Sequence, residues 1–206
     1  MSNQSTYLGE PPENEMTRSA YERDRADDGY VWNVTRLWSW RNDFEHAFVA
    51  LRTSLVEGSA LTDREKAILN AAAAAAAAAR RDSYCSLAWG PRLAALTDDE
   101  TAAATLAGRE APALTEREGA LANWARQVVA APGETNEADV ERLRSVGLDD
   151  QTIFEATAFI ALRLAFSTIN GALGAAPDRQ LANAAPQLIR AAVDYGRPPS
   201  AEPSRP

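Results

Sequence analysis

The sequence of 206 residues is short of several residue types, and each shortage argues against a class of function. It holds one cysteine, Cys85, and one histidine, His46, which exclude an intramolecular disulfide and argue against a zinc or iron centre. Its 21 Lys and Arg are outnumbered by 29 Asp and Glu and form no cluster that would follow a phosphate backbone. We therefore expect no metal, no cofactor and no nucleic acid partner.

Long apolar runs are also missing. No stretch approaches the roughly 20 apolar residues that span a bilayer. The N-terminus, MSNQSTYLGE, is polar and acidic, where a secretory signal would be basic and then apolar. These two absences predict a cytoplasmic protein that does not bind membranes.

The length favours one domain with flexible ends. Residues 1–28 have little to bury, and residues 197–206 carry four prolines, so we expect both ends to be disordered or wrapped on the surface. The domain itself then covers residues 29–196. Within it, apolar residues recur at helical spacing and no alternating run predicts a strand, while residues such as Gly58 and Gly147 mark helix ends. The pattern predicts an all-α domain of six or seven helices.

One short motif occurs twice. LTDRE at residues 61–65 recurs as LTERE at residues 114–118, each directly before an Ala-rich helical segment. Both are capping boxes, in which the threonine accepts a bond from a backbone N–H and the glutamate reaches back to the backbone N–H of the threonine. Each motif therefore predicts a helix start.

The order of features along the chain carries a family likeness. A segment rich in aromatic residues (LWSWRNDFEHAFVALRTSL) precedes LTDRE, an Ala-rich stretch and RDSYCSLAWG, and the second half continues with LTEREGALANWARQVV and a long apolar segment before Pro177-Asp178. This order resembles the carboxymuconolactone decarboxylase and alkylhydroperoxidase D-like superfamily. The resemblance implies an alkylhydroperoxidase D-like helical bundle that forms a homo-oligomer, whether dimer, trimer or hexamer.

The resemblance also implies positions for a redox site. Such proteins typically reduce hydroperoxides through a Cys-x-x-Cys pair, with a histidine four residues later and a relay glutamate on the preceding helix. Here Cys85 matches the second cysteine, and Asp82 stands at the position of the first. Trp89 replaces the histidine, and the relay position falls at Asn70, or at Glu65 if the helix is shifted by about one turn. The Asn-Arg pair that is frequent on the late helix of the family is replaced by Ser167 and Thr168.

Cys85 supports two interpretations. Asp82 or Ser83 can cap a helix that starts there, which places the thiol in a first turn whose free N–H groups stabilise a thiolate, and Arg80 and Arg81 would lower its pKa further. A peroxidase with one cysteine then needs an external thiol to reduce its sulfenic acid. Alternatively, Cys85 is a small buried apolar residue, as most free cysteines are.

Asp82 also has two roles open to it. It is either a helix cap or the general acid or base of a cofactor-free lyase or isomerase that acts on a small carboxylated or lactone substrate. In the second case Tyr84, Trp89 and Asn70 would shape the substrate pocket, although Trp89 suits packing better. We favour the peroxidase with catalytic Cys85, Asp82 and Glu65, and keep as alternatives the lyase and a non-catalytic assembly subunit whose cleft is filled by Trp89.

The remaining conspicuous residues suit structural roles. His46 lies among the apolar residues of the segment rich in aromatics, where a structural role is the better interpretation. Trp32, Trp38 and Trp40 lie close together in the sequence, and such a group typically forms a core anchor or a subunit contact.

Overall fold

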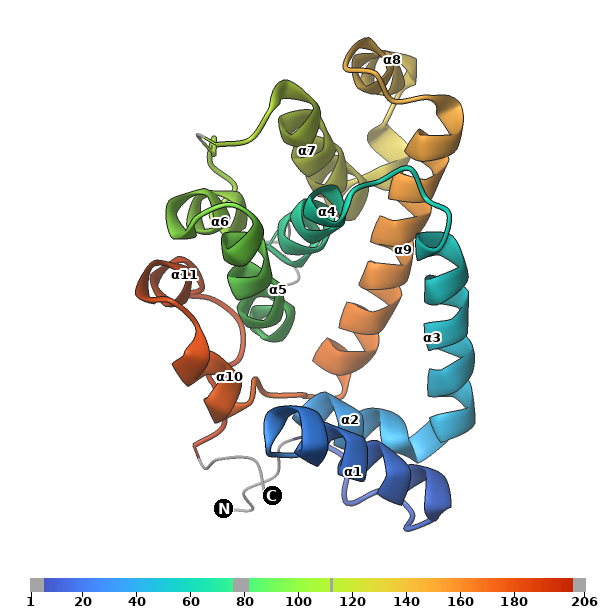
Figure 1. Ribbon diagram of the computed structural model, residues 1–206, viewed down its shortest axis with the longest axis vertical. Coiled ribbons are helices and arrows are strands. Elements are labelled where there is room, and N and C mark those ends of the chain that lie inside the picture. The colour runs from blue at the N-terminus through green and yellow to red at the C-terminus, as the bar shows by residue number, and fades with distance from the viewer. Residues whose placement is uncertain (1–5, 76–81, 112, 202–206) are drawn as a thin grey trace.

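The computed structural model describes residues 6–75, 82–111 and 113–201, and within these ranges every regular element is a helix. The all-α prediction is confirmed (Figure 1). The α-helices are α1 (Glu15–Asp28), α2 (Asn33–Trp38), α3 (Asn42–Val56), α4 (Asp63–Ala75), α5 (Ser83–Leu96), α6 (Asp99–Leu106), α7 (Glu116–Ala130), α8 (Glu137–Ser145), α9 (Asp150–Ala172), α10 (Arg179–Ala184) and α11 (Gln187–Ala192). Two short 3₁₀ helices are η1 (Ser39–Arg41) and η2 (Pro132–Glu134).

The predicted number of helices was too low. The described ranges contain eleven α-helices where the sequence pattern predicted six or seven. Three of them, α2, α10 and α11, have six residues each. A helix of fewer than two turns shows too few repeats of the apolar spacing to stand out from a loop.

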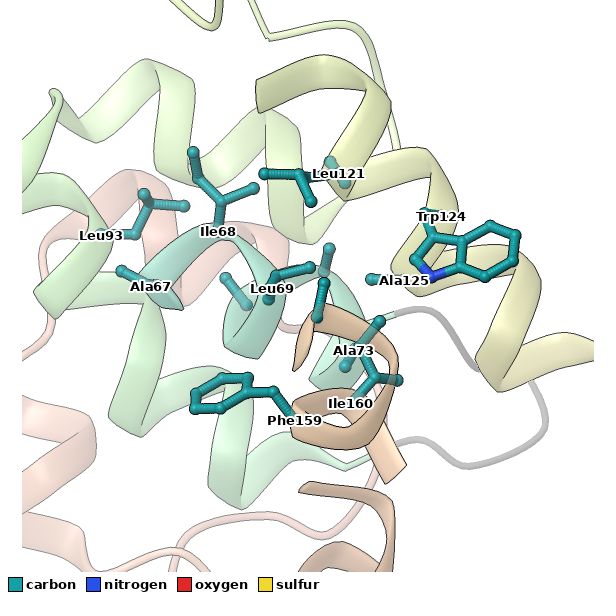
Figure 2. Close-up of a cluster of buried hydrophobic side chains, with 14 of the residues drawn as sticks. Ala67, Ile68, Leu69, Ala73, Leu93, Leu121, Trp124, Ala125, Phe159 and Ile160 are labelled. Atoms are coloured by element: carbon teal, nitrogen blue, oxygen red, sulfur yellow. The ribbon is translucent and has the colours of Figure 1, made fainter. Parts of the chain in front are cut away.

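Helix α4 lies at the centre of the bundle, with α5, α6, α7 and α9 packed around it (Figure 1). Ile68, Leu69, Ala71 and Ala72 are all fully buried, so α4 has apolar contacts around its circumference. Figure 2 shows Ile68 and Leu69 among side chains that come from the neighbouring helices, such as Ile160 of α9. The alanines let these helices approach closely, because each adds only a methyl group to the interface.

The first 28 residues contain a helix. Asn14 accepts a hydrogen bond from the backbone N–H of Thr17 at 2.8 Å and caps α1, and Gly29 ends that helix with φ of 80°. Of the two alternatives predicted for this arm, disorder is therefore wrong for Glu15–Asp28, because a capped N-terminus and a glycine C-cap give even a polar segment a defined start and end. Residues 1–5 lie outside the described residues.

The C-terminal tail is held against the domain over its first part. Ser83 Oγ donates to the backbone oxygen of Arg197 at 2.7 Å, and the backbone N–H of Ser200 donates to Pro177 O at 2.9 Å. These bonds place the start of the tail next to the first turn of α5. The rest of the predicted tail, residues 202–206, lies outside the described residues.

The three tryptophans occupy different environments. Trp38 is buried and stacks on Phe44 and Phe166, so it belongs to the core. Trp32 is half-buried, and Trp40 is 41% exposed. His46 is an exposed residue of α3.

Helix α9 is long and apolar enough, by length and composition, to cross a membrane. It packs against α3, α4, α7 and α8, and core helices of soluble proteins meet the same criteria. The expectation that the chain does not bind membranes stays a prediction.

Both predicted capping boxes are present in the structure. Thr62 Oγ1 accepts from the backbone N–H of Glu65 at 3.1 Å, and Glu65 Oε2 accepts from the N–H of Thr62 at 2.7 Å. Thr115 and Glu118 repeat the arrangement at the start of α7, at 3.2 and 2.8 Å. The repeated motif therefore starts two helices that pack against each other.

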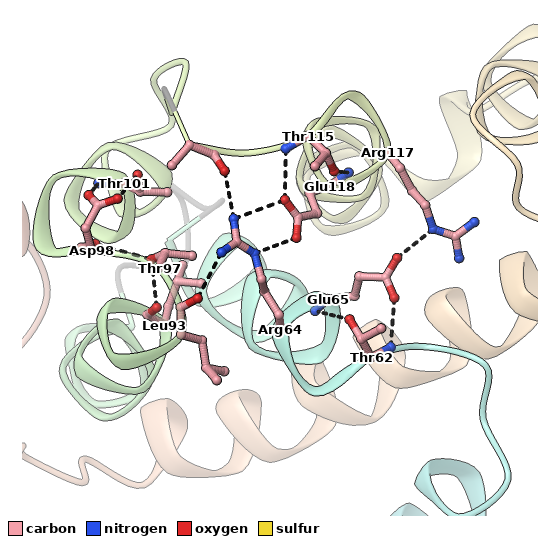
Figure 3. Close-up of polar contacts among 12 residues, drawn as sticks. Thr62, Arg64, Glu65, Leu93, Thr97, Asp98, Thr101, Thr115, Arg117 and Glu118 are labelled. Atoms are coloured by element: carbon pink, nitrogen blue, oxygen red, sulfur yellow. Dashed lines mark hydrogen bonds and ion pairs between the residues drawn. The ribbon is translucent and has the colours of Figure 1, made fainter.

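The same two motifs exchange ion pairs (Figure 3). Arg64 Nε donates to Glu118 at 2.6 Å, and Arg117 Nε donates to Glu65 at 2.6 Å, so each arginine reaches the capping glutamate of the other motif. The arginines also donate to backbone oxygens, Arg64 to those of two segments and Arg117 to that of Gly147. We call this set the reciprocal clamp; its members are Thr62, Arg64, Glu65, Thr115, Arg117 and Glu118.

Candidate functional site

Cys85 lies in the first turn of α5, as the sequence predicted. Asp82 is the N-cap, and its Oδ1 accepts from the backbone N–H of Cys85 at 2.9 Å. Ser83, the alternative cap, instead donates to the tail. The side chain of Cys85 is 2% exposed, and Arg80 and Arg81, which were expected to lower its pKa, lie outside the described residues.

Two side chains of α9 contact the sulfur. Arg163 Nη2 donates to Cys85 Sγ, and Ser167 Oγ, one turn further along α9, lies 3.7 Å from the same atom. Arg163 is 8% exposed, and no carboxylate of the described residues forms an ion pair with it. Its guanidinium instead lies over the Phe166 ring, 4.7 Å from the ring centre. The buried cation and the sole cysteine sulfur of the chain are therefore direct neighbours.

The surroundings of Cys85 favour the thiol over the thiolate. Burial raises the pKa of the Cys85 thiol well above its ordinary value, and the positive charge of Arg163 only partly opposes this effect. The Asp82 carboxylate raises the pKa further, through its negative charge and through hydrogen bonding to the sulfur. The expected low pKa is therefore wrong for this conformation, because desolvation outweighs the helix N-terminus.

A pocket of about 540 Å³ opens beside the first turn of α5. Asp82 and Tyr84 line it from α5 and its cap, Ser167 and Asn170 from α9, and Arg197 from the tail. Cys85 does not line it, but Ser167 both lines it and contacts the sulfur. The sulfur therefore lies one side chain behind the pocket wall.

The Tyr84 hydroxyl is not available to a substrate in this pocket. It donates to Asp178 Oδ2, and the other oxygen of Asp178 accepts from the backbone N–H of Asn33 at 3.0 Å. Burial raises the pKa of Tyr84 well above its ordinary value, and the charge of Asp178 adds to this. Tyr84 therefore lines the pocket, as predicted, but its hydroxyl has an internal partner.

Unpartnered polar atoms are concentrated around the site. Among the described residues, the buried side-chain nitrogen and oxygen atoms without a hydrogen-bond partner are Tyr21 Oη, Asp82 Oδ2, Arg126 Nε, Arg163 Nε and Asn170 Nδ2. Three of these five belong to residues that line the pocket or touch Cys85. Native proteins leave few such atoms, so their presence in residues of the pocket wall marks positions where a ligand would supply the missing partner.

Glu65 is not brought to Cys85. Its neighbour Arg64 donates to the oxygen of Leu96, at the end of α5, and 11 residues separate Leu96 from Cys85. That separation is about 16 Å along a helix axis. Burial acts to raise the pKa of Glu65, but hydrogen bonds from Arg117 and Thr62 outweigh it and hold the pKa below its ordinary value. Glu65 is thus an ionised member of the reciprocal clamp and not a proton relay for Cys85.

Asn70 and Trp89 do not line the pocket either. Asn70 is buried and its Nδ2 donates to Lys66 O at 2.9 Å, one turn back on α4. Trp89 is half-buried, packs on the main core and carries the Arg92 guanidinium over its ring, 4.9 Å from the ring centre. Trp89 is not part of the pocket wall and therefore does not fill the pocket. The hypothesis of a non-catalytic assembly subunit required a cleft that Trp89 fills.

The residues that the sequence patterns missed are Arg163, Asn170 and Arg197. A charged residue in the middle of an apolar helix, such as Arg163 in α9, is a signal for a buried role, whereas an asparagine such as Asn170 gives no such signal in one sequence. Over the described ranges, no group of three or more His, Cys, Asp or Glu residues could hold a metal ion.

Comparison with known proteins shows the fold. No family profile and no curated protein matches the sequence. The structure of a peroxidase-related protein with an alkylhydroperoxidase AhpD core, from Ralstonia eutropha, matches with a TM-score of 0.74 and 24% identity over 85% of this chain and 94% of that one. A peroxidase-related protein from a Silicibacter species matches with a TM-score of 0.74 and 22% identity over 86% and 94%.

A third structure comes from a protein with a different described activity. A cysteine-to-alanine variant of the debrominase Bmp8, in complex with 2,3,4-tribromopyrrole, matches with a TM-score of 0.64 and 16% identity over 91% of this chain and 96% of that one. All three matches cover most of both chains. At these identities they establish the fold, which is alkylhydroperoxidase D-like, as the sequence motifs predicted.

Proposed function

We propose that this alkylhydroperoxidase D-like bundle is a peroxidase-related oxidoreductase that uses Cys85 as its single redox cysteine and an external small thiol as reductant. The observation that carries the proposal is the contact between Arg163 and the Cys85 sulfur. A buried guanidinium stays charged, so it favours an anion beside it, and the thiolate is the anion that this contact would stabilise. The likeness to two peroxidase-related structures supports the same reaction class.

The proposed reaction starts with the proton of the thiol. Asp82, whose carboxylate interacts with the thiol and whose Oδ2 has no hydrogen-bond partner, accepts that proton, and Arg163 and Ser167 hold the resulting thiolate. The thiolate attacks the terminal oxygen of a hydroperoxide, so that an S–O bond forms and the O–O bond breaks. The leaving alkoxide takes the proton from Asp82 and departs as an alcohol.

The cycle closes with two molecules of the external thiol. The first condenses with the sulfenic acid of Cys85, which releases water and forms a mixed disulfide. The second attacks the mixed disulfide, so that the thiol of Cys85 is restored and a small-molecule disulfide leaves. Because the sulfur lies behind Ser167, the wall formed by Ser167 and the first turn of α5 has to open before either reactant reaches it.

The experiment compares the wild-type protein with Cys85→Ser. Each is mixed with cumene hydroperoxide and excess β-mercaptoethanol, and hydroperoxide loss is measured together with labelling by a dimedone-type probe for sulfenic acid. We expect both signals in the wild type and neither in the variant. Thermal unfolding of both proteins checks that the variant is folded. Equal hydroperoxide loss in the two proteins would remove Cys85 from the reaction.

A second candidate function rests on Asp82. Its unpartnered Oδ2 belongs to a residue of the pocket wall, which suits a general base acting on a small carboxylated or lactone substrate without a thiol step. The two candidates differ in what Cys85→Ser does. Turnover of such a substrate that survives Cys85→Ser but not Asp82→Asn would identify a lyase or isomerase.

We also propose that the protein is a homo-oligomer. Trp40, Phe44 and Leu51, on η1 and α3, are 41%, 48% and 55% exposed, which leaves large apolar side chains on one side of the molecule. Size-exclusion chromatography with light scattering measures the mass of the protein in solution. We expect a mass above that of one 22.2 kDa chain.

A further inference from the structure

The orientation of the Asn170 amide is fixed by its partner. Trp38 Nε1 donates to Asn170 Oδ1 at 2.8 Å, and an indole N–H can only donate, so the oxygen of the amide has to face Trp38. Asn170 is 1% exposed and lines the pocket beside α5, and its Nδ2 has no hydrogen-bond partner. An amide N–H₂ that is fixed in place and has no partner provides a donor for a ligand.

Two further residues of the same pocket offer other kinds of contact, a hydrogen-bond acceptor on Asp82 and a positive charge on Arg197. Asp82 Oδ2 is an acceptor without a partner. Arg197 is a cation that forms no ion pair within the described part of the chain; its Nη2 donates to Gly171 O at 3.2 Å and its guanidinium lies 4.7 Å from the centre of the Tyr7 ring. The lining of the pocket therefore combines an acceptor with negative charge, a neutral donor and a positive charge.

We infer that this pocket binds a small organic acid that also carries a hydroxyl or hydroperoxyl group. Arg197 pairs with the acidic group, Asp82 Oδ2 accepts from the O–H, and Asn170 Nδ2 donates to an oxygen of the ligand. The two charges set the orientation, because the carboxylate of Asp82 repels the acidic end and attracts the O–H. The inference rests on the proposed peroxidase function only where it identifies the ligand as a hydroperoxide substrate. Binding of the acid itself requires no turnover.

The test measures binding by isothermal titration calorimetry, on the wild-type protein and on Cys85→Ser. The probe is para-(α-hydroxyisopropyl)benzoate, the alcohol that the corresponding hydroperoxide would yield. Two analogues each lack one feature: para-isopropylbenzoate has no hydroxyl, and the methyl ester of the probe has no charge. We expect the probe to bind both proteins equally, because Cys85 does not line the pocket, and each analogue to bind about tenfold more weakly or worse.

Variants then assign the contacts. Arg197→Gln and Asn170→Asp are each expected to weaken binding of the probe by about tenfold or more, and Asn170→Asp retains an oxygen for Trp38. Arg190→Gln is the matched control, since Arg190 is exposed on α11 and does not line the pocket. Equal affinities for the three compounds, unchanged binding in both pocket variants, or no binding by the wild type would overturn the inference. Failure of the peroxidase assay alone would leave it standing, because binding to Cys85→Ser is measured separately.

Discussion

The reciprocal clamp and the Cys85 site both contain arginines and carboxylates, but these groups are paired with each other in the clamp and are not paired at the Cys85 site. In the clamp, Glu65 and Glu118 each accept hydrogen bonds from an arginine and from a backbone N–H. None of the six members has a buried side-chain nitrogen or oxygen without a hydrogen-bond partner. At the Cys85 site, Arg163 has no carboxylate, and the carboxylate of Asp82 has one oxygen without a partner. Both regions lie at helix N-termini, so the difference comes from pairing and not from helix position.

The difference has an energetic consequence. A satisfied buried pair is costly to break, because removal of one partner leaves the other charge desolvated. An unsatisfied charge is already desolvated in the folded protein, so its removal costs little or even stabilises the fold. The comparison therefore predicts that clamp variants lose stability and keep the chemistry, whereas site variants lose the chemistry and keep stability.

The strongest test on the site side is Arg163→Met. If Arg163 holds the thiolate, the rate of hydroperoxide consumption should fall by about 100-fold or more, since loss of one preorganised donor to a developing anion typically costs that much. The midpoint of unfolding in urea should stay the same or rise. Arg126→Met is the matched control, because Arg126 also has an unpartnered Nε but does not contact the sulfur, and it should keep the wild-type rate.

On the clamp side, Glu65→Ala and Glu118→Ala should each lower the free energy of unfolding by about 2–3 kcal/mol, because each removes a partly buried ion pair and one half of a capping box. The two losses should be similar, since the contacts are reciprocal. Glu141→Ala is the control: Glu141 pairs with Arg144 on the surface, with side chains 65% and 39% exposed, and its loss should cost less than about 0.5 kcal/mol. Urea unfolding measures all three, and a cost for the clamp variants no larger than that of the control would contradict the comparison.

The same contrast explains how much was predictable from the sequence. Thr62 and Glu65, like Thr115 and Glu118, are joined by local contacts, and spacing alone predicted both capping boxes. The Asp82 cap was also predicted for this reason. The exchange of arginines between the motifs was not, because it depends on how α4 and α7 pack. The assignment of Glu65 as a catalytic relay failed on the same point: its partner is Arg117, which is 52 residues away in the sequence.

Contacts made at long range hid most of the site. The partner of Cys85 is Arg163, separated by 78 residues, and the partner of Trp38 is Asn170, separated by 132. No local pattern encodes either contact, and burial of the thiol, which reverses the expected direction of its pKa shift, is a property of the whole bundle.

The pH dependence of stability sharpens the comparison at Cys85. The folded-state pKa of the thiol is raised, so the stabilisation is complete below the ordinary thiol pKa and is lost as the pH rises above it, where the unfolded chain releases the proton and the folded chain does not. The unfolding free energy should therefore fall between about pH 8 and 9.5, and Cys85→Ser should reduce that fall by about 1 kcal/mol. Urea unfolding at several pH values measures it. Identical slopes in the two proteins would mean that folding does not shift the pKa of the thiol, and a steeper fall in the variant would mean that the thiol is already ionised beside Arg163.

The variant Asp82→Asn has the smallest expected effect on stability, and it separates the role of Asp82 as a helix cap from its role as proton acceptor. Asparagine caps helices as well as aspartate does, so Asp82→Asn should keep the bond from the Cys85 N–H and change the unfolding free energy by less than about 0.5 kcal/mol. Asp98→Asn is the matched control at the start of α6, where both carboxylate oxygens accept bonds from Thr101, and it should be the more destabilising of the two. The hydroperoxide reaction should respond in the reverse order, because only Asp82 is placed to take the proton of Cys85. An Asp82→Asn protein with the wild-type rate and pH profile would reduce Asp82 to a cap and leave the solvent as the base.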